Sequence, residues 1–286
     1  MNIQKKARFI SEFARREMTA EALVLGYDMN TPLGKRAVIN AIAATMDSIG
    51  DPLDRVWIED ATGKRYTYKV EQAQAVLGDP ANFRYFWAIP QSERRNSKAR
   101  WLTAATIDNI AIKGATFFFA LPRGMAREFG PHVTLLRSLA QADIVPQYGF
   151  GYAREYGNPD YFALGYVNKS GIRAIDEPDW DRSSPGEHPG RYARRAILDV
   201  FPMNVLSDVH LQQRLAGESF KEWIFRHTGP ESLLQFGPRC FAWFVPASQT
   251  VSLSARLKVF GMTLREHPEA GVLPVSQVRS SIRYRI

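Results

Sequence analysis

The apolar residues of this chain gather in stretches of strand length, and this feature constrains its fold most. The strongest stretch, residues 115–121 (ATFFFAL), is far shorter than the roughly 20 residues that a helix needs to cross a bilayer. Similar stretches occupy 21–28 and 239–245, and helical patterns separate them. With 286 residues, 45% of them hydrophobic, the chain can bury a large core. We therefore expect a globular protein of mixed helices and strands that does not span a membrane.

Two segments repeat the order strand, helix, strand, strand. In residues 21–69 the helix begins with Thr31 as N-cap and Pro32 in its first turn, and in residues 114–167 it begins at the Gly-Pro of 130–131. Short turns join the strands that follow each helix, so these strands are expected to pair antiparallel. The repetition is explained by two related strand-helix-strand-strand halves, or by chance recurrence of a common α+β unit.

The predicted fold class is therefore α+β, mainly an antiparallel sheet with helices packed on it. Residues 1–286 form a single domain, or two halves at 1–78 and 101–286 joined by a linker or long loop over 79–100. That segment contains Pro80, Pro90 and a polar cluster, which are typical of exposed loops. Further helices are predicted over 3–18, 219–227 and 230–236, and further strands over 101–112, 144–152, 161–167, 251–260 and 275–284.

The cysteine content and the N-terminus indicate a cytoplasmic protein. Cys240 is the single cysteine, so the chain has neither an internal disulfide nor a thiolate cluster for zinc. The N-terminus begins basic, but charges at Glu12, Arg15, Arg16 and Glu17 interrupt the apolar region that a signal peptide requires.

The net charge of +8 raises the question of nucleic-acid binding. Residues 239–286 carry seven basic and two acidic groups, whereas residues 101–238 carry 14 and 15. The basic residues of this C-terminal segment are Arg239, Arg256, Lys258, Arg265, Arg279, Arg283 and Arg285. No run of basic residues is longer than two, so a solvated basic surface explains the charge better than a nucleic-acid site.

No catalytic, metal-binding or cofactor-binding motif is recognised in the sequence. No two of the five histidines have the i, i+4 spacing of a helical metal site, so each, His132 included, is expected to be a surface or capped histidine. The glycines of 149–151 lie in an expected strand rather than at the strand-to-helix turn of a dinucleotide cradle. We expect them to let strands pack closely or bulge, and we expect Ser219 to begin a helix. Accordingly no cofactor, no metal and no enzymatic activity is expected.

An acidic loop with one aromatic residue is the most distinctive local feature. It consists of Asp176, Glu177, Asp179, Trp180 and Asp181. Its composition suits contact with a partner protein, because a Trp among charges is typical of interface hot spots. Its four carboxylates could hold a hard cation such as calcium, but the loop lacks the alternating oxygen ligands and the mid-loop glycine of an EF-hand. A solvated loop is the alternative.

Several segments, read in series, resemble a known family. They are residues 115–140 (ATFFFALPRGMAREFGPHVTLLRSLA), 148–153 (YGFGYA), 197–206 (ILDVFPMNVL) and 220–224 (FKEWI). Their order is similar to that of a family of bacterial type VI secretion immunity proteins, formerly a domain of unknown function. The resemblance implies a cytoplasmic α+β protein that binds and blocks a cognate effector toxin without catalysis, and it offers no catalytic residues.

Two alternatives remain from other classes of function. One is an enzyme whose site is assembled from dispersed residues, around Cys240 or the carboxylates of 176–181. The other is a nucleic-acid-associated protein that uses the basic C-terminal segment. The sequence leaves open the identity of the partner, the surface that binds it, and the oligomeric state.

Overall fold

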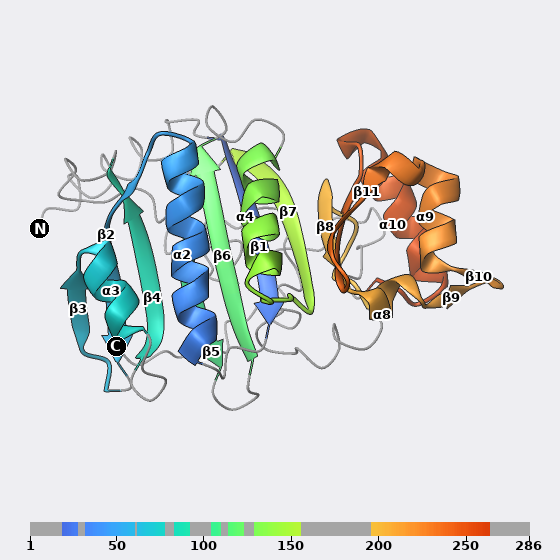
Figure 1. Cartoon of the computed structure of the whole chain (residues 1–286). Helices are drawn as coiled ribbons and strands as arrows, with labels where there is room; N and C mark the ends of the chain where they lie inside the picture. The colour runs from blue at the N-terminus through green and yellow to red at the C-terminus, as the bar shows by residue number, and fades with distance from the viewer. Residues whose placement is uncertain are drawn as a thin grey trace, which may run out of the picture.

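The computed structural model describes residues 19–27, 32–60, 62–77, 83–91, 104–109, 114–122, 129–155 and 196–263. In these residues ten strands form one sheet in the order β11-β12-β8-β7-β1-β6-β5-β4-β2-β3 (Figure 1). Each neighbouring pair of the ten is antiparallel. The fold is therefore α+β, as predicted.

The strands of the sheet are β1 (Thr19–Tyr27), β2 (Leu53–Asp60), β3 (Arg65–Tyr68), β4 (Phe83–Pro90), β5 (Ala104–Asn109), β6 (Gly114–Pro122), β7 (Tyr148–Glu155), β8 (Met203–Leu206), β11 (Leu233–Gly237) and β12 (Cys240–Phe244). A small separate hairpin pairs β9 (Arg214–Leu215) with β10 (Glu218–Ser219). The helices are α2 (Pro32–Ser48), α3 (Val70–Val76), α4 (Gly130–Gln141), α8 (Asp208–Leu211), α9 (Phe220–Thr228) and α10 (Thr250–Val259), with 3-10 turns η4 (Pro230–Ser232) and η5 (Ala247–Gln249). Over the described ranges, no helix has both the length and the apolar character needed to cross a membrane.

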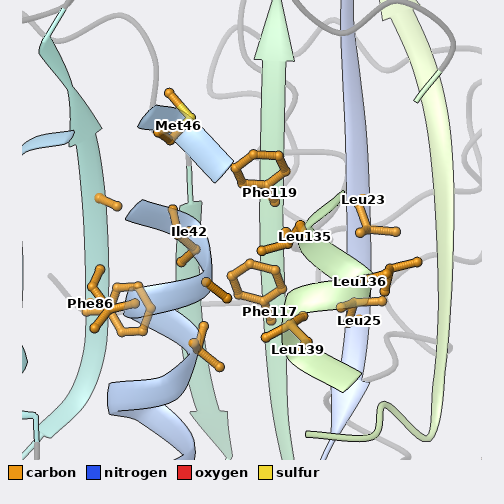
Figure 2. Close-up of a cluster of buried hydrophobic side chains, with 14 of the residues drawn as sticks. Leu23, Leu25, Ile42, Met46, Phe86, Phe117, Phe119, Leu135, Leu136 and Leu139 are labelled. Carbon is orange, nitrogen blue, oxygen red and sulfur yellow. The ribbon is translucent and has the colours of Figure 1, made fainter. Parts of the chain in front are cut away.

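Helices α2 and α4 lie side by side across one face of the sheet, and α3 lies beyond α2 (Figure 1). Their apolar sides meet Leu23 and Leu25 of β1 and Phe117 and Phe119 of β6, as Figure 2 shows. Ile42 and Met46 from α2 and three leucines of α4 complete this first core, because they recur at helical spacing on the side that faces the sheet.

A second core lies on the opposite face of the sheet, at the β7-β8-β12 end. Successive side chains of a strand point to opposite faces, so neighbouring residues of one strand belong to different cores. In β8, Val205 packs into the first core and Leu206 into the second; in β12, Ala242 and Trp243 are divided in the same way. Helices α9 and α10 cover the second core through residues that include Phe220, Trp223, Leu253 and Leu257. Residues 196–263 therefore stabilise both layers of the molecule.

Three sequence-based expectations are corrected. Residues 83–90 lie inside the segment 79–100 expected to be a linker or loop, but they form β4, which pairs with β2 on one side and β5 on the other. The strand expected over 251–260 is helix α10. The helix expected over 230–236 is only a 3-10 turn followed by β11. The predicted elements at 3–18, 161–167 and 275–284 lie outside the described residues.

Candidate functional site

The acidic loop of Asp176, Glu177, Asp179, Trp180 and Asp181 lies outside the described residues. Partner contact through this loop therefore stays a prediction. In the parts of the chain that the structure describes, no group of three or more His, Cys, Asp or Glu side chains is close enough to hold a metal ion.

Cys240 lies in β12 and is buried in the first core. Burial of the thiol in these apolar surroundings raises the pKa of Cys240 to about 12. At neutral pH roughly one such thiol in 100,000 is ionised, and the thiolate is the nucleophilic form. The environment of Cys240 therefore does not activate its thiol as a nucleophile. This removes Cys240 as support for the alternative of an enzyme.

The three described histidines occupy separate places in the fold. His132, expected at the surface or in a cap, is buried in the first core, where its ring meets Phe119 and Phe129 edge-on at 5.3 and 5.4 Å. His210 is buried beside Ser207, whose hydroxyl lies 2.8 Å from the imidazole Nδ1. His227 stacks on Trp223 at 4.0 Å, and its Nδ1 donates to the Trp223 carbonyl at 2.8 Å. His188 and His267 lie outside the described residues.

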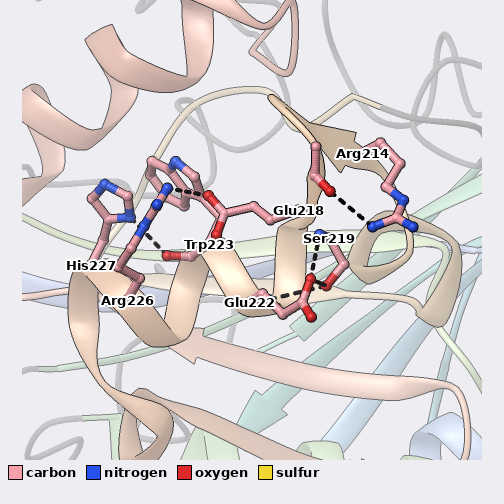
Figure 3. Close-up of polar contacts among 8 residues, drawn as sticks. Arg214, Glu218, Ser219, Glu222, Trp223, Arg226 and His227 are labelled. Carbon is pink, nitrogen blue, oxygen red and sulfur yellow. Dashed lines mark hydrogen bonds and ion pairs between the residues drawn. The ribbon is translucent and has the colours of Figure 1, made fainter.

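The hairpin β9–β10 and helix α9 form a polar edge, which Figure 3 shows. Ser219 caps α9 as predicted: the backbone N–H of Glu222 donates to its hydroxyl at 3.2 Å, and Glu222 Oε2 accepts from the Ser219 N–H at 2.7 Å. The Ser219 backbone and side-chain hydrogen bonds lower the pKa of Glu222. At the same edge Arg226 of α9 forms an ion pair with Glu218 of β10.

The contacts of this polar edge stabilise the local fold and do not form a catalytic arrangement. Ser219 and His227 stand at the two ends of α9, eight residues or about 12 Å apart along the helix. The Ser219 hydroxyl bonds to Glu222, and the His227 Nδ1 bonds to a backbone carbonyl, so the two do not act as a nucleophile and its base. Trp223, between them, is buried in the second core and meets Trp243 edge-on at 6.3 Å.

The outer side of α10 carries an exposed apolar stripe of Val251, Ala255 and Val259. Val251 is 72% exposed and Val259 is 82% exposed, and Phe260, which follows the helix, is 41% exposed. This stripe was not predicted, because apolar residues alternate with polar ones over 251–260 and this pattern favours a strand. The signal that would have found it is the i, i+4, i+8 spacing of the three small apolar residues.

The basic C-terminal segment is partly described. Arg239 pairs with Asp208 at 3.6 Å, while Arg256 and Lys258 are exposed on α10. Arg265, Arg279, Arg283 and Arg285 lie outside the described residues. Of the three basic residues of this segment that the structure describes, Arg256 and Lys258 therefore lie on the same helix as the apolar stripe.

A scan of protein-family models and a search of curated proteins give no match to this chain. Among solved structures, the chain is similar to one described as the T6SS protein PA0821 of Pseudomonas aeruginosa. The two share 13% sequence identity at a TM-score of 0.59, over 96% of this chain and 88% of the other. At this identity the likeness is one of fold alone.

Proposed function

We propose that this chain is a type VI secretion immunity protein, which binds a cognate effector toxin in the cytoplasm and neutralises it by occlusion, with no catalysis of its own. The observation that carries the proposal is the shared fold with a T6SS protein across almost the full length of both chains. The resemblance of residues 115–140, 148–153, 197–206 and 220–224 to T6SS immunity proteins supports it from the sequence.

The architecture suits a protein that acts by occlusion. In the described residues, α2, α3 and α4 pack on one face of the sheet, and α9 and α10 pack on the other face at the β7-β8-β12 end. Close-packed layers hold the backbone beneath the surface in place before a partner arrives, so we expect binding to cost little backbone freedom. Surfaces of this kind bind partners with small backbone changes.

Co-expression with the effector encoded beside this chain's gene tests the proposal. The effector alone is expected to arrest growth of a host cell, and this chain is expected to restore growth. A tagged copy is expected to retain the effector in a 1:1 ratio through a wash at about 0.5 M salt, which screens exposed charges and weakens phosphate contacts. An effector from an unrelated secretion cluster is the control and should be neither neutralised nor retained.

Other outcomes would overturn the proposal. Full toxicity in the presence of this chain, with no complex, would reject the immunity function. Retention of nucleic acid that disappears as the salt concentration rises would favour the nucleic-acid alternative instead.

A further inference from the structure

Helix α10 is apolar on two sides, although a helix at the surface usually has one apolar side. Its inner side, Leu253, Ser254 and Leu257, is buried against the second core. Its outer side carries the stripe of Val251, Ala255 and Val259 at exposures that reach 82%. Exposed apolar residues that gather in one place, rather than singly, mark sites of interaction.

The charged residues of α10 itself have one sign. Because residues of an α-helix are turned by about 100° from one to the next, Lys258 lies on one flank of the stripe and Arg256 on the other. Residues 246–263 contain no Asp or Glu. The stripe is about 12 Å long, so it is an apolar centre between two cations.

The position of α10 is fixed by contacts of its buried inner side and by the turn that closes its C-terminal end. The Ser254 hydroxyl donates to the buried carboxylate of Asp199. After the helix, Gly261 adopts a positive φ of 66°, and the N–H of Met262 donates to the Leu257 carbonyl at 3.1 Å, which closes the last turn. Since the inner side is held in this way, α10 presents its outer side without rearrangement.

We propose that the outer face of α10 docks against the effector, on an apolar patch of the effector that is bordered by acidic side chains. This inference rests on the proposed function and adds the surface and the chemistry of the partner. The stripe would be only part of the interface. Stable interfaces bury about 800 Å² on each partner, which is more than three side chains supply. Its apolar centre would supply buried contact, and Arg256 and Lys258 would speed the approach of an acidic surface.

A protein partner fits this face better than a membrane or a nucleic acid. Helices that insert into a membrane surface carry large residues such as Trp, Phe and Leu along their apolar side, whereas this stripe is Val, Ala and Val. A nucleic-acid surface interleaves many cations with aromatic side chains, whereas α10 has two cations divided by apolar residues.

The test compares two double variants in binding to the purified effector encoded beside this gene. Val251→Asp with Val259→Asp removes the apolar contact and adds repulsion from an acidic border, so we expect an affinity loss of about 100-fold or more. Val251→Lys with Val259→Lys removes the same contact but adds attraction, so we expect a distinctly smaller loss. Leu234→Asp, at a 42%-exposed apolar residue of β11, is the matched control and should change the affinity less than about threefold. Equal melting temperatures would establish that all variants fold.

Four results would overturn the inference. Affinity within twofold of wild type for the Asp variant would remove α10 from the interface while leaving the immunity function intact. A Lys variant as weak as the Asp variant would reject the acidic border. A dimer of the wild-type protein that the Asp variant converts to a monomer, measured by light scattering without effector, would assign the face to a second copy of this chain. Failure of the wild-type chain to bind the effector would reject the proposed function together with this inference.

Discussion

Gly151 of β7 leaves room for two side chains that a larger residue would displace. It pairs with Leu23 of β1 and Met203 of β8, and a methyl group on it would lie 2.9 Å from the Phe129 ring and 3.1 Å from the Met203 Cβ. We predict that Gly151→Ala lowers the free energy of unfolding by about 1–3 kcal/mol, the usual cost of overpacking. Gly130→Ala, where nothing lies within 4 Å, is the control for urea unfolding and should stay within about 0.5 kcal/mol. Equal stability of the two variants would contradict this account.

Ser254 connects α10 to the buried Asp199 through a hydrogen bond to the carboxylate. Since hydrogen bonds to charged groups are the stronger kind, we predict that Ser254→Ala costs about 1–3 kcal/mol of unfolding free energy in chemical denaturation. Ser252, on the exposed side of the same helix, donates to the Gln249 carbonyl at 3.0 Å and provides the matched control. A Ser252→Ala variant that is as unstable as Ser254→Ala would show that the loss arises from the helix itself and not from Asp199.

At the scale of single residues, the sequence predicted roles where local geometry decides them. The glycines of 148–153 were expected to allow close packing, and Gly151 does so. Ser219 was expected to begin a helix, and it caps α9. The burial of His132 was not predicted, because it depends on rings from β6 and from the residue before α4 that no local pattern connects.

The start of α9 depends on pH through Glu222. Its pKa is lowered by hydrogen bonds from Ser219, so the ionised carboxylate favours the folded state. This contribution is complete above the ordinary pKa of 4.5 and disappears as the pH falls through the lowered pKa of the folded state. We predict that the urea midpoint of wild type falls more steeply than that of Glu222→Gln below about pH 4.5. Parallel pH profiles for the two proteins would contradict a stabilising role of the charge.

At the scale of elements, helix α2 was predicted from the sequence and helix α10 was not. In α2, Val38, Ile42 and Met46 recur every four residues and all are buried, so the pattern and the burial agree. In α10 the apolar residues Val251 and Val259 are exposed, while the buried set includes Ser254. The apolar residues of α10 therefore belong to two faces, one buried and one exposed. Along the sequence they alternate with polar residues, as they would in a strand.

At the scale of the whole molecule, the sequence predicted an antiparallel α+β protein but not the order of its sheet. The two prolines and the polar cluster of segment 79–100 favoured a loop. Strand β4, which lies between β2 and β5, was therefore not predicted. The run 83–89 (FRYFWAI) is rich in aromatic residues and is itself a local strand signal, but the place of β4 between β2 and β5 depends on pairing with strands outside the segment. For the candidate surface, the i, i+4, i+8 spacing of the α10 stripe can be read from the sequence, but its exposure depends on which side of the helix the second core covers.

Strand β8, like β12, contributes side chains to both cores, and this predicts how the molecule unfolds. Val205 is buried in the first core and its neighbour Leu206 in the second. We predict that Val205→Ala costs about 2 kcal/mol and Leu206→Ala about 2–5 kcal/mol. Because the strand between them is shared, either variant should speed hydrogen exchange in both α2 and α9, with one unfolding transition. The control is Val251→Ala, at an exposed site, which should leave exchange unchanged. Faster exchange confined to α2 in Val205→Ala and to α9 in Leu206→Ala would instead establish two layers that unfold independently.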